Sequence, residues 1–136
     1  MNTLQKGKIG LTTAIHYFTV NGYNVLLPLN DSQAYDLAIE KDGEIKTVQC
    51  KTTWEYSKNN DDIYVASLRT MGGTKGTVYY RLTDTKVDYL FCYRGDGIKY
   101  LIPVSEIRKH GYKSSIRLVT KKTPHCKLQT ENYIVD

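Results

Sequence analysis

Three polar residues between positions 35 and 53 have side chains that suit the hydrolysis of a phosphodiester. Asp36 begins one alternating run of polar and apolar residues, and Gln49 and Lys51 lie near the end of the next run. A carboxylate and a side-chain carbonyl are oxygen ligands that can hold Mg²⁺. A lysine ammonium can stabilise the charge that develops on phosphate or orient the attacking water. This chemistry requires that the three side chains meet.

A β-hairpin is the element that would bring them together. Asp42-Gly43 is the strongest short-range signal for a two-residue hairpin loop, and with this loop Asp36 lies directly opposite Gln49. The Cβ atoms of opposed residues are about 4.5–5.5 Å apart, and Lys51 shares the face of Gln49 because strand side chains alternate. The opposite face is apolar and is expected to pack on the core: Leu37, Ile39, Val48 and Cys50.

The hairpin geometry alone leaves two interpretations open. The three residues could form a catalytic site, or Asp36 and Lys51 could form an exposed cross-strand ion pair with Gln49 between them. Such surface pairs are common and contribute only about 0–1 kcal/mol to stability.

The remaining pattern predicts one α/β domain that spans residues 1–136, with a helix ahead of a mixed sheet. Residues 2–21 carry apolar side chains at helical spacing and end at Asn21-Gly22. Residues 23–29 are expected to form a short buried strand that ends at Pro28. A strand at residues 62–68, a hairpin around residues 95–97, a short helix at 105–109 and a last strand near 116–119 complete the domain.

The composition points to a globular protein with an anionic partner. The 136 residues are 40% hydrophobic and 24% charged, and we expect a cytoplasmic protein because no signal peptide or long apolar run appears. Three widely spaced cysteines indicate neither a disulfide framework nor a zinc site. Residues 69–127 hold 13 of the 19 Lys and Arg residues but only 4 of the 14 acidic ones. The anionic partner of a basic surface is most commonly nucleic acid, although a solvated basic face is the alternative.

Residues 69–86 combine glycines, basic residues and adjacent tyrosines, a composition that suits a DNA-contact segment better than a core. Lys6 and Lys8 beside the glycines of the first helix are further candidates for phosphate contacts. The complete set of predicted DNA-binding residues is Lys6, Lys8, Arg69, Lys75, Tyr79, Tyr80, Arg81, Arg108, Lys109, Lys113, Arg117, Lys121 and Lys122.

These motifs resemble the PD-(D/E)XK nucleases. The spacing of Asp36 and Gln49-Cys50-Lys51, together with "KGKIG", "NGYNVLLPL" and "YDLAIEKDG", is most similar to the small homing endonucleases encoded by cyanobacterial group I introns. The resemblance covers residues 6–53. It implies a restriction-endonuclease-like αβββαβ core, a divalent metal bound by Asp36 and assisted by Gln49, and a catalytic role for Lys51.

Two positions depart from the family pattern. Gln49 replaces the usual acidic residue, which keeps an oxygen ligand but loses a charge. Relatives often carry a glutamate on the first helix where this chain has Leu11, and Leu11 also fits the apolar stripe of that helix. Asp36 would then be the single carboxylate at the metal site.

The resemblance implies a Mg²⁺-dependent endonuclease that cuts double-stranded DNA, with intron homing as its biology. A duplex break needs two sites related by a dyad, so we expect a homodimer or homotetramer. Two alternatives remain: a catalytically weakened or silent DNA-binding module, which Leu11 and Gln49 favour, and a nuclease of the Holliday-junction or restriction type.

Overall fold

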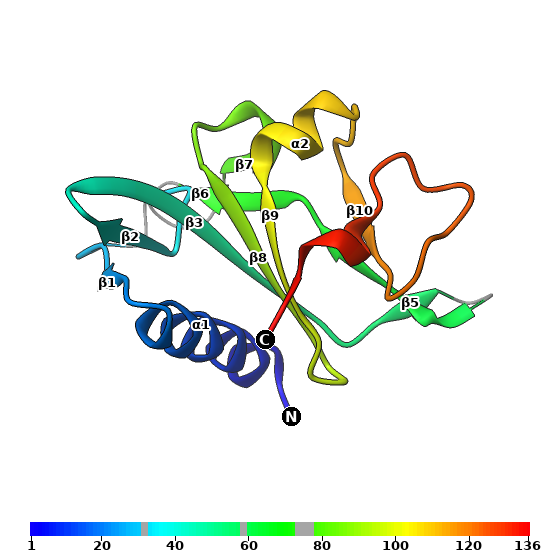
Figure 1. Cartoon of the computed structure of the whole chain (residues 1–136), viewed down its shortest axis with the longest axis horizontal. Coiled ribbons are helices and arrows are strands. Elements are labelled where there is room, and N and C mark those ends of the chain that lie inside the picture. The colour runs from blue at the N-terminus through cyan, green and yellow to red at the C-terminus, as the bar shows by residue number, and fades with distance from the viewer. Residues whose placement is uncertain (31–32, 58–59, 73–77) are drawn as a thin grey trace.

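The computed structural model describes residues 1–30, 33–57, 60–72 and 78–136 of the chain, which form one main helix and three groups of strands (Figure 1). The largest group is a six-stranded sheet in the order β1-β2-β3-β8-β9-β11. Its strands are β1 (Asn24–Leu26), β2 (Leu37–Lys41), β3 (Glu44–Thr53), β8 (Tyr89–Arg94), β9 (Lys99–Pro103) and β11 (Ile134–Val135). β3 and β8 run parallel and the other pairs antiparallel, so the expected mixed sheet is confirmed.

The other elements lie over this sheet or beside it. The helices are α1 (Thr3–Val20) and α2 (Val104–Lys109), with 3-10 turns η1 (Leu82–Asp84) and η2 (Thr130–Tyr133). A second sheet has the order β10-β5-β4, formed by β10 (Ser115–Leu118), β5 (Asn60–Ser67) and β4 (Tyr56–Ser57). A separate antiparallel ladder joins β6 (Arg69–Gly72) and β7 (Val78–Arg81). No helix in the described part of the chain is long and apolar enough to cross a membrane.

α1 begins and ends where the sequence predicts. The side chain of Asn2 accepts a hydrogen bond from the backbone N–H of Gln5, and the Gln5 side chain accepts one from the Asn2 N–H, so two otherwise unpaired helix donors are satisfied. Asn21 terminates the helix. Ala14 and Phe18 are fully buried, whereas Leu4 at the start of the helix is 68% exposed, so the buried stripe occupies the later turns of α1.

The first hairpin has the predicted register. Asp42 and Gly43 both adopt positive φ values, 54° and 84°, as a two-residue hairpin turn of this kind requires, and Leu37 pairs with Val48. One face of the hairpin packs under α1 in a core cluster that comprises Ala14, Phe18, Leu37, Ile39, Val48 and Phe91. The predicted apolar face is confirmed.

The opposite face of the sheet is less open than the sequence suggested. A second core covers the middle of this face, where Leu90 pairs with Gln49 and Ile102 pairs with Leu90. Gln49 itself is only 6% exposed. The middle of the main sheet is therefore enclosed between two cores, and the half-buried polar residues Lys51 and Thr52 follow the buried Gln49 along β3.

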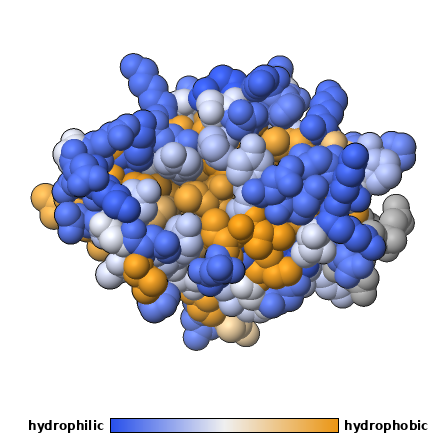
Figure 2. Space-filling view, in the orientation of Figure 1, coloured by the Kyte–Doolittle hydropathy of each residue, from blue (hydrophilic) through white to orange (hydrophobic). Residues whose placement is uncertain are grey.

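The structure differs from the sequence prediction at two edge strands. Of the expected strand at residues 23–29, only Asn24–Leu26 form a strand, β1, at the edge of the sheet. Leu26 is 45% exposed and Leu29, beyond the strand, is fully exposed, so the expectation of a buried strand was wrong. β11, which the sequence did not predict, adds an edge to the sheet beside β9. Figure 2 shows that hydrophilic side chains cover most of the periphery of one face, while hydrophobic surface gathers toward its centre.

Candidate active site

The catalytic candidates from the hairpin and from α1 line one cavity of about 580 Å³. Asp36, Gln49 and Lys51 contribute from the hairpin, and Leu11 contributes from the helix. The remaining lining residues are Thr3, Leu4, Lys6, Gly7, Lys8, Cys50 and Thr52. The first half of α1 and the second half of β3 therefore form the two walls of the cavity.

Asp36 is fixed by two hydrogen bonds to β3. Its backbone N–H donates to the carbonyl of Val48 at 2.9 Å, and its carboxylate Oδ2 accepts from the backbone N–H of Cys50 at 2.8 Å. Burial raises the pKa of Asp36 above its usual value, while the Cys50 N–H and the charge of Lys51 act in the opposite direction. The carboxylate is thus held rigidly in a partly desolvated place where a nearby cation would stabilise it.

Lys51 reaches across to a different element. Its ammonium donates a hydrogen bond to the backbone carbonyl of Arg69, the first residue of β6. Burial lowers the pKa of Lys51, and the negative charge of Asp36 partly offsets that effect. The opposite charges of Asp36 and Lys51 therefore stabilise each other. The hydrogen bond to Arg69 also connects Lys51 to β6.

Close packing between α1 and β3 closes one wall of the cavity. A Cβ atom added to Gly10 would lie 2.0 Å from Oγ1 of Thr52 and 3.3 Å from its Cβ, so only a glycine allows the helix to approach this closely. Leu11 follows directly, is half-buried and packs against the core under the helix. Its side chain lines the cavity as well, so one residue serves both the core and the cavity wall.

The oxygen atoms in the cavity are of the kind that could hold a hard divalent metal ion such as Mg²⁺. Mg²⁺ in nuclease-type sites is bound by one or two carboxylates, with water and substrate phosphate as the other ligands. The cavity supplies the carboxylate of Asp36 and the side chain of Gln49, whose Nε2 donates to the Cys50 carbonyl at 3.4 Å. Among the described residues, no group of three or more His, Cys, Asp or Glu side chains could hold a metal ion. The protein contributes one formal negative charge, so substrate phosphate would have to supply the rest.

Part of the predicted DNA-contact segment forms the β6–β7 hairpin. Arg69 pairs with Arg81 across the ladder and Thr70 pairs with Tyr80. Both arginines are exposed, and Tyr80 is 41% exposed. Lys75 lies outside the described residues, and of Tyr79 only the backbone is described. The structure therefore brings Arg69, Tyr80 and Arg81 together on an element that contacts Lys51.

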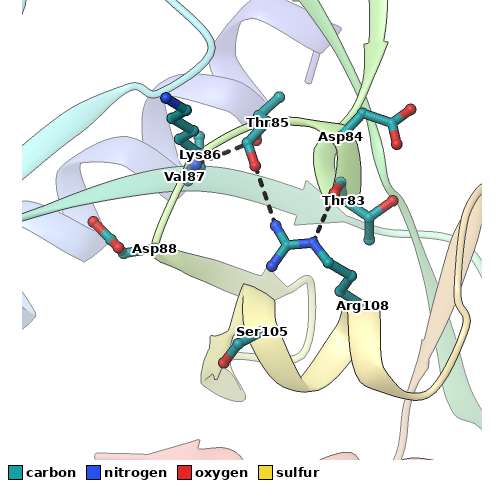
Figure 3. Close-up of a pocket in the computed structure, with 8 residues that line it drawn as sticks. All are labelled: Thr83, Asp84, Thr85, Lys86, Val87, Asp88, Ser105 and Arg108. Atoms are coloured by element: carbon teal, nitrogen blue, oxygen red, sulfur yellow. Dashed lines mark hydrogen bonds between the residues drawn. The ribbon is translucent and has the colours of Figure 1, made fainter.

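Arg108 has a role within the fold that the sequence did not reveal. Its Nε donates to the carbonyl of Thr83 at 2.9 Å and its Nη2 to the carbonyl of Thr85 at 3.1 Å (Figure 3). The three residues line a cavity of about 470 Å³ between α2 and the segment that follows β7. Arg108 thereby ties α2 to the base of the β6–β7 hairpin.

The other basic candidates fall into two groups. Lys6 and Lys8 line the cavity that holds Asp36. The second group follows Arg108 in the chain and consists of exposed residues at the end of α2, in the loop before β10, on β10 and in the loop after it: Lys109, Lys113, Arg117, Lys121 and Lys122. The loop after β10, which carries Lys121 and Lys122, lies on the opposite side of the view from β2 (Figure 1). The predicted DNA-binding residues thus do not form one continuous patch around the cavity.

Sequence reasoning missed the contribution of the backbone. The N–H of Cys50 holds Asp36, and the carbonyl of Arg69 holds Lys51. The strand pattern could have indicated the first contact, because Cys50 follows the residue opposite Asp36. The second contact joins segments 18 residues apart, and no local signal in the sequence marks it.

Comparison with known proteins agrees with this arrangement. The family model described as PD-(D/E)XK endonuclease matches residues 1–133. The chain is similar to the solved structure of a bacterial homing endonuclease, I-Ssp6803I, with 27% identity and a TM-score of 0.72 over 98% of this chain and 87% of that chain. No curated protein matches the chain. The fold expected from the motifs is confirmed, and the chain belongs to the PD-(D/E)XK endonuclease family, whose members are nucleases.

Proposed function

We propose that this endonuclease uses Mg²⁺ to cut both strands of DNA and that its biological role is homing. The observation that carries the proposal is the meeting of Asp36, Gln49 and Lys51 in one cavity, with Lys51 bonded to a hairpin that bears exposed arginines. The similarity to a protein whose printed name is a bacterial homing endonuclease supports the homing role.

Each cavity residue has a distinct task in this proposal. Asp36 and Gln49 would hold the metal through their side-chain oxygens, and the bond from the Cys50 N–H would keep the Asp36 carboxylate in place. When bound, the metal would polarise the scissile phosphate and activate water. The Lys51 ammonium would stabilise the negative charge that develops on the phosphate oxygens, or orient the attacking water.

The DNA would lie along the side of the molecule that carries the cavity and the β6–β7 hairpin. Lys6, Lys8, Arg69 and Arg81 would contact phosphates, and the segment at residues 69–86 would provide the main contact within a single domain of 136 residues. One cavity cuts one strand, so a duplex break requires at least two copies related by a two-fold axis. We therefore propose a homodimer or a homotetramer.

A second candidate is a catalytically weakened nuclease that binds DNA. Leu11 favours it, because a hydrocarbon side chain lines the cavity beside Asp36 and offers no oxygen to a metal. The fold and the DNA contacts would be kept, and the rate of cleavage would be low. The Leu11 variant described in the Discussion separates this candidate from a fully active enzyme.

Cleavage assays with three substrates test the proposal. We expect the protein with Mg²⁺ to linearise a plasmid that carries the uninterrupted target gene, and to leave it supercoiled in EDTA. A plasmid without the target and a synthetic four-way junction are the controls. Preferential cleavage of the junction would instead support a resolvase, and binding of the target plasmid without cleavage would support the weakened form.

A further inference from the structure

The hydrogen bond between Lys51 and Arg69 joins the cavity to the basic hairpin. The Lys51 ammonium has three N–H donors, and one of them is used by the carbonyl of Arg69. Two donors are then left for the reacting phosphate or a water molecule. Lys51 is half-buried, so its long side chain is held along its length as well as at its tip.

The strand pairing explains why this carbonyl points toward Lys51. The N–H of Leu82 donates to the carbonyl of Leu68 at 2.7 Å, which makes these two residues a hydrogen-bonded pair at the base of the hairpin. Hydrogen-bonded and non-hydrogen-bonded pairs alternate along an antiparallel ladder. Arg69 and Arg81 are therefore a non-hydrogen-bonded pair, in which the backbone groups point away from the partner strand. The Arg69 carbonyl is thus directed outward, where it accepts the hydrogen bond from the Lys51 ammonium.

The base of the hairpin is anchored to the rest of the protein. Leu68 and Leu82 are fully buried, and the N–H of Leu68 donates to the carbonyl of Ser114 at 2.9 Å. The guanidinium group of Arg108 donates hydrogen bonds to the carbonyls of Thr83 and Thr85 just beyond β7 (Figure 3). Arg69 and Arg81 sit one residue from this anchored pair, so their positions relative to the cavity are fixed by the fold.

The two arginines form an unfavourable pair unless an anion lies between them. Directly opposed side chains of a non-hydrogen-bonded pair are close together, with Cα atoms about 4.5 Å apart, and like charges at such positions are destabilising. Both side chains are exposed. A backbone phosphate would relieve the repulsion and accept hydrogen bonds from both guanidinium groups.

We propose that Arg69 and Arg81 bind one phosphate of the DNA backbone and that the carbonyl of Arg69 fixes the Lys51 ammonium relative to that phosphate. Arg69 is then a positioning residue for Lys51 as well as a DNA contact, and docking of the hairpin determines which phosphodiester faces the cavity. This inference rests on the proposed nuclease function. In this proposal, DNA binding at the hairpin places the phosphodiester relative to the Lys51 ammonium, which the metal site alone would not do.

Separate measurements of binding and cleavage test the coupling through Arg69→Gln. Removal of one phosphate contact should weaken DNA binding by about three- to tenfold at moderate salt. The first-order cleavage rate at saturating DNA should also fall by at least about tenfold, because the variant keeps the backbone carbonyl that bonds Lys51 but no longer holds the phosphate in a fixed place relative to the Lys51 ammonium. Arg69→Lys should restore most of the rate. Lys127→Gln, which removes one exposed charge elsewhere, is the matched control and should leave the saturated rate unchanged. A normal saturated rate for Arg69→Gln would overturn the proposal.

A measurement without metal distinguishes a failure of this inference from a failure of the nuclease proposal. The Lys51 ammonium resonance can be assigned in ¹⁵N-lysine-labelled protein by its loss in Lys51→Ala. We expect target DNA in EDTA to shift this resonance in the wild type and to shift it less in Arg69→Gln, even at saturation. That result in a protein that does not cut would support the coupling and contradict the nuclease proposal. Equal shifts in both proteins, or no DNA binding, would overturn the coupling.

Discussion

Leu11→Glu places a carboxylate in the cavity beside Asp36 and tests whether the missing ligand limits cleavage. Leu11 is half-buried and packs against the core under α1. Loss of that apolar contact should cost about 1 kcal/mol, roughly half the value of a fully buried leucine. A second carboxylate near the partly desolvated Asp36 adds like-charge repulsion and its own desolvation, about 1–2 kcal/mol. We therefore expect the free energy of unfolding of Leu11→Glu in EDTA to be about 2–3 kcal/mol lower than that of the wild type, and the melting temperature to fall by roughly 10 °C.

Mg²⁺ should reverse part of this loss. A ligand that binds only the folded state stabilises it by about 2.7 kcal/mol at a concentration 100 times its dissociation constant. The Leu11→Glu protein should therefore recover most of its melting temperature in excess Mg²⁺, and the wild type should respond much less. The cleavage rate of the Leu11→Glu protein should be at least about tenfold above that of the wild type, which corresponds to about 1.4 kcal/mol of extra transition-state stabilisation.

Leu11→Gln is the control for the carboxylate. Glutamine has nearly the same shape as glutamate and loses the same apolar contact, but it carries no charge. It should lower the melting temperature without a comparable response to Mg²⁺ and without faster cleavage. The two variants should be compared by thermal unfolding and by plasmid linearisation, each with and without Mg²⁺. If Leu11→Glu and Leu11→Gln respond to Mg²⁺ equally and cut at the wild-type rate, Leu11 is simply a core residue and the reasoning is refuted.

Three further predictions follow from the packing, the charges and the expected symmetry. Gly10→Ala should lower stability by about 1–3 kcal/mol, because its Cβ would overlap Thr52. A Cβ at Gly7 would meet nothing within 4 Å, so Gly7→Ala should be neutral or stabilising by up to about 1 kcal/mol. Equal melting temperatures for the two variants would contradict the close approach of α1 to β3. Arg81→Ala should weaken DNA binding and reduce its salt dependence by about one unit of slope, and an unchanged slope would place DNA elsewhere. Light scattering should give a dimer or a tetramer, and a monomer both free and on DNA would rule out a symmetric duplex break.

The hairpin could be predicted from the sequence because its determinants are local. Asp42-Gly43 supplies the turn, and the alternation of side chains sets both faces, so the meeting of Asp36 with β3 follows from the register. The caps of α1 are local signals as well, since Asn2 and Gln5 bond to each other and Asn21 ends the helix. The family resemblance then provided the expected role of each cavity residue.

The remaining features depend on contacts between distant segments. No pattern in the local sequence marks three of these contacts. They are the hydrogen bond from Lys51 to the Arg69 carbonyl, the close approach of Gly10 to Thr52, and the hydrogen bonds from Arg108 to two backbone carbonyls. Arg94 is a further case. Arginine side chains are mostly exposed in proteins, but that of Arg94 is 3% exposed, forms a 2.6 Å ion pair with Asp96 and donates a hydrogen bond to a backbone carbonyl of β10. Such groups are recognised only when the fold shows what surrounds them.

Lys51→Ala tests the central claim most directly when cleavage and DNA binding are measured on the same protein. Removal of a group that stabilises charge in the transition state should reduce plasmid cleavage by a factor on the order of 100–1000, with little change in affinity for the target DNA. The measurement should be made in both the wild-type and the Leu11→Glu backgrounds, so that a slow parent enzyme does not hide the effect. The account predicts that binding persists and cleavage is lost. A Lys51→Ala protein that cuts at the rate of its parent would contradict it.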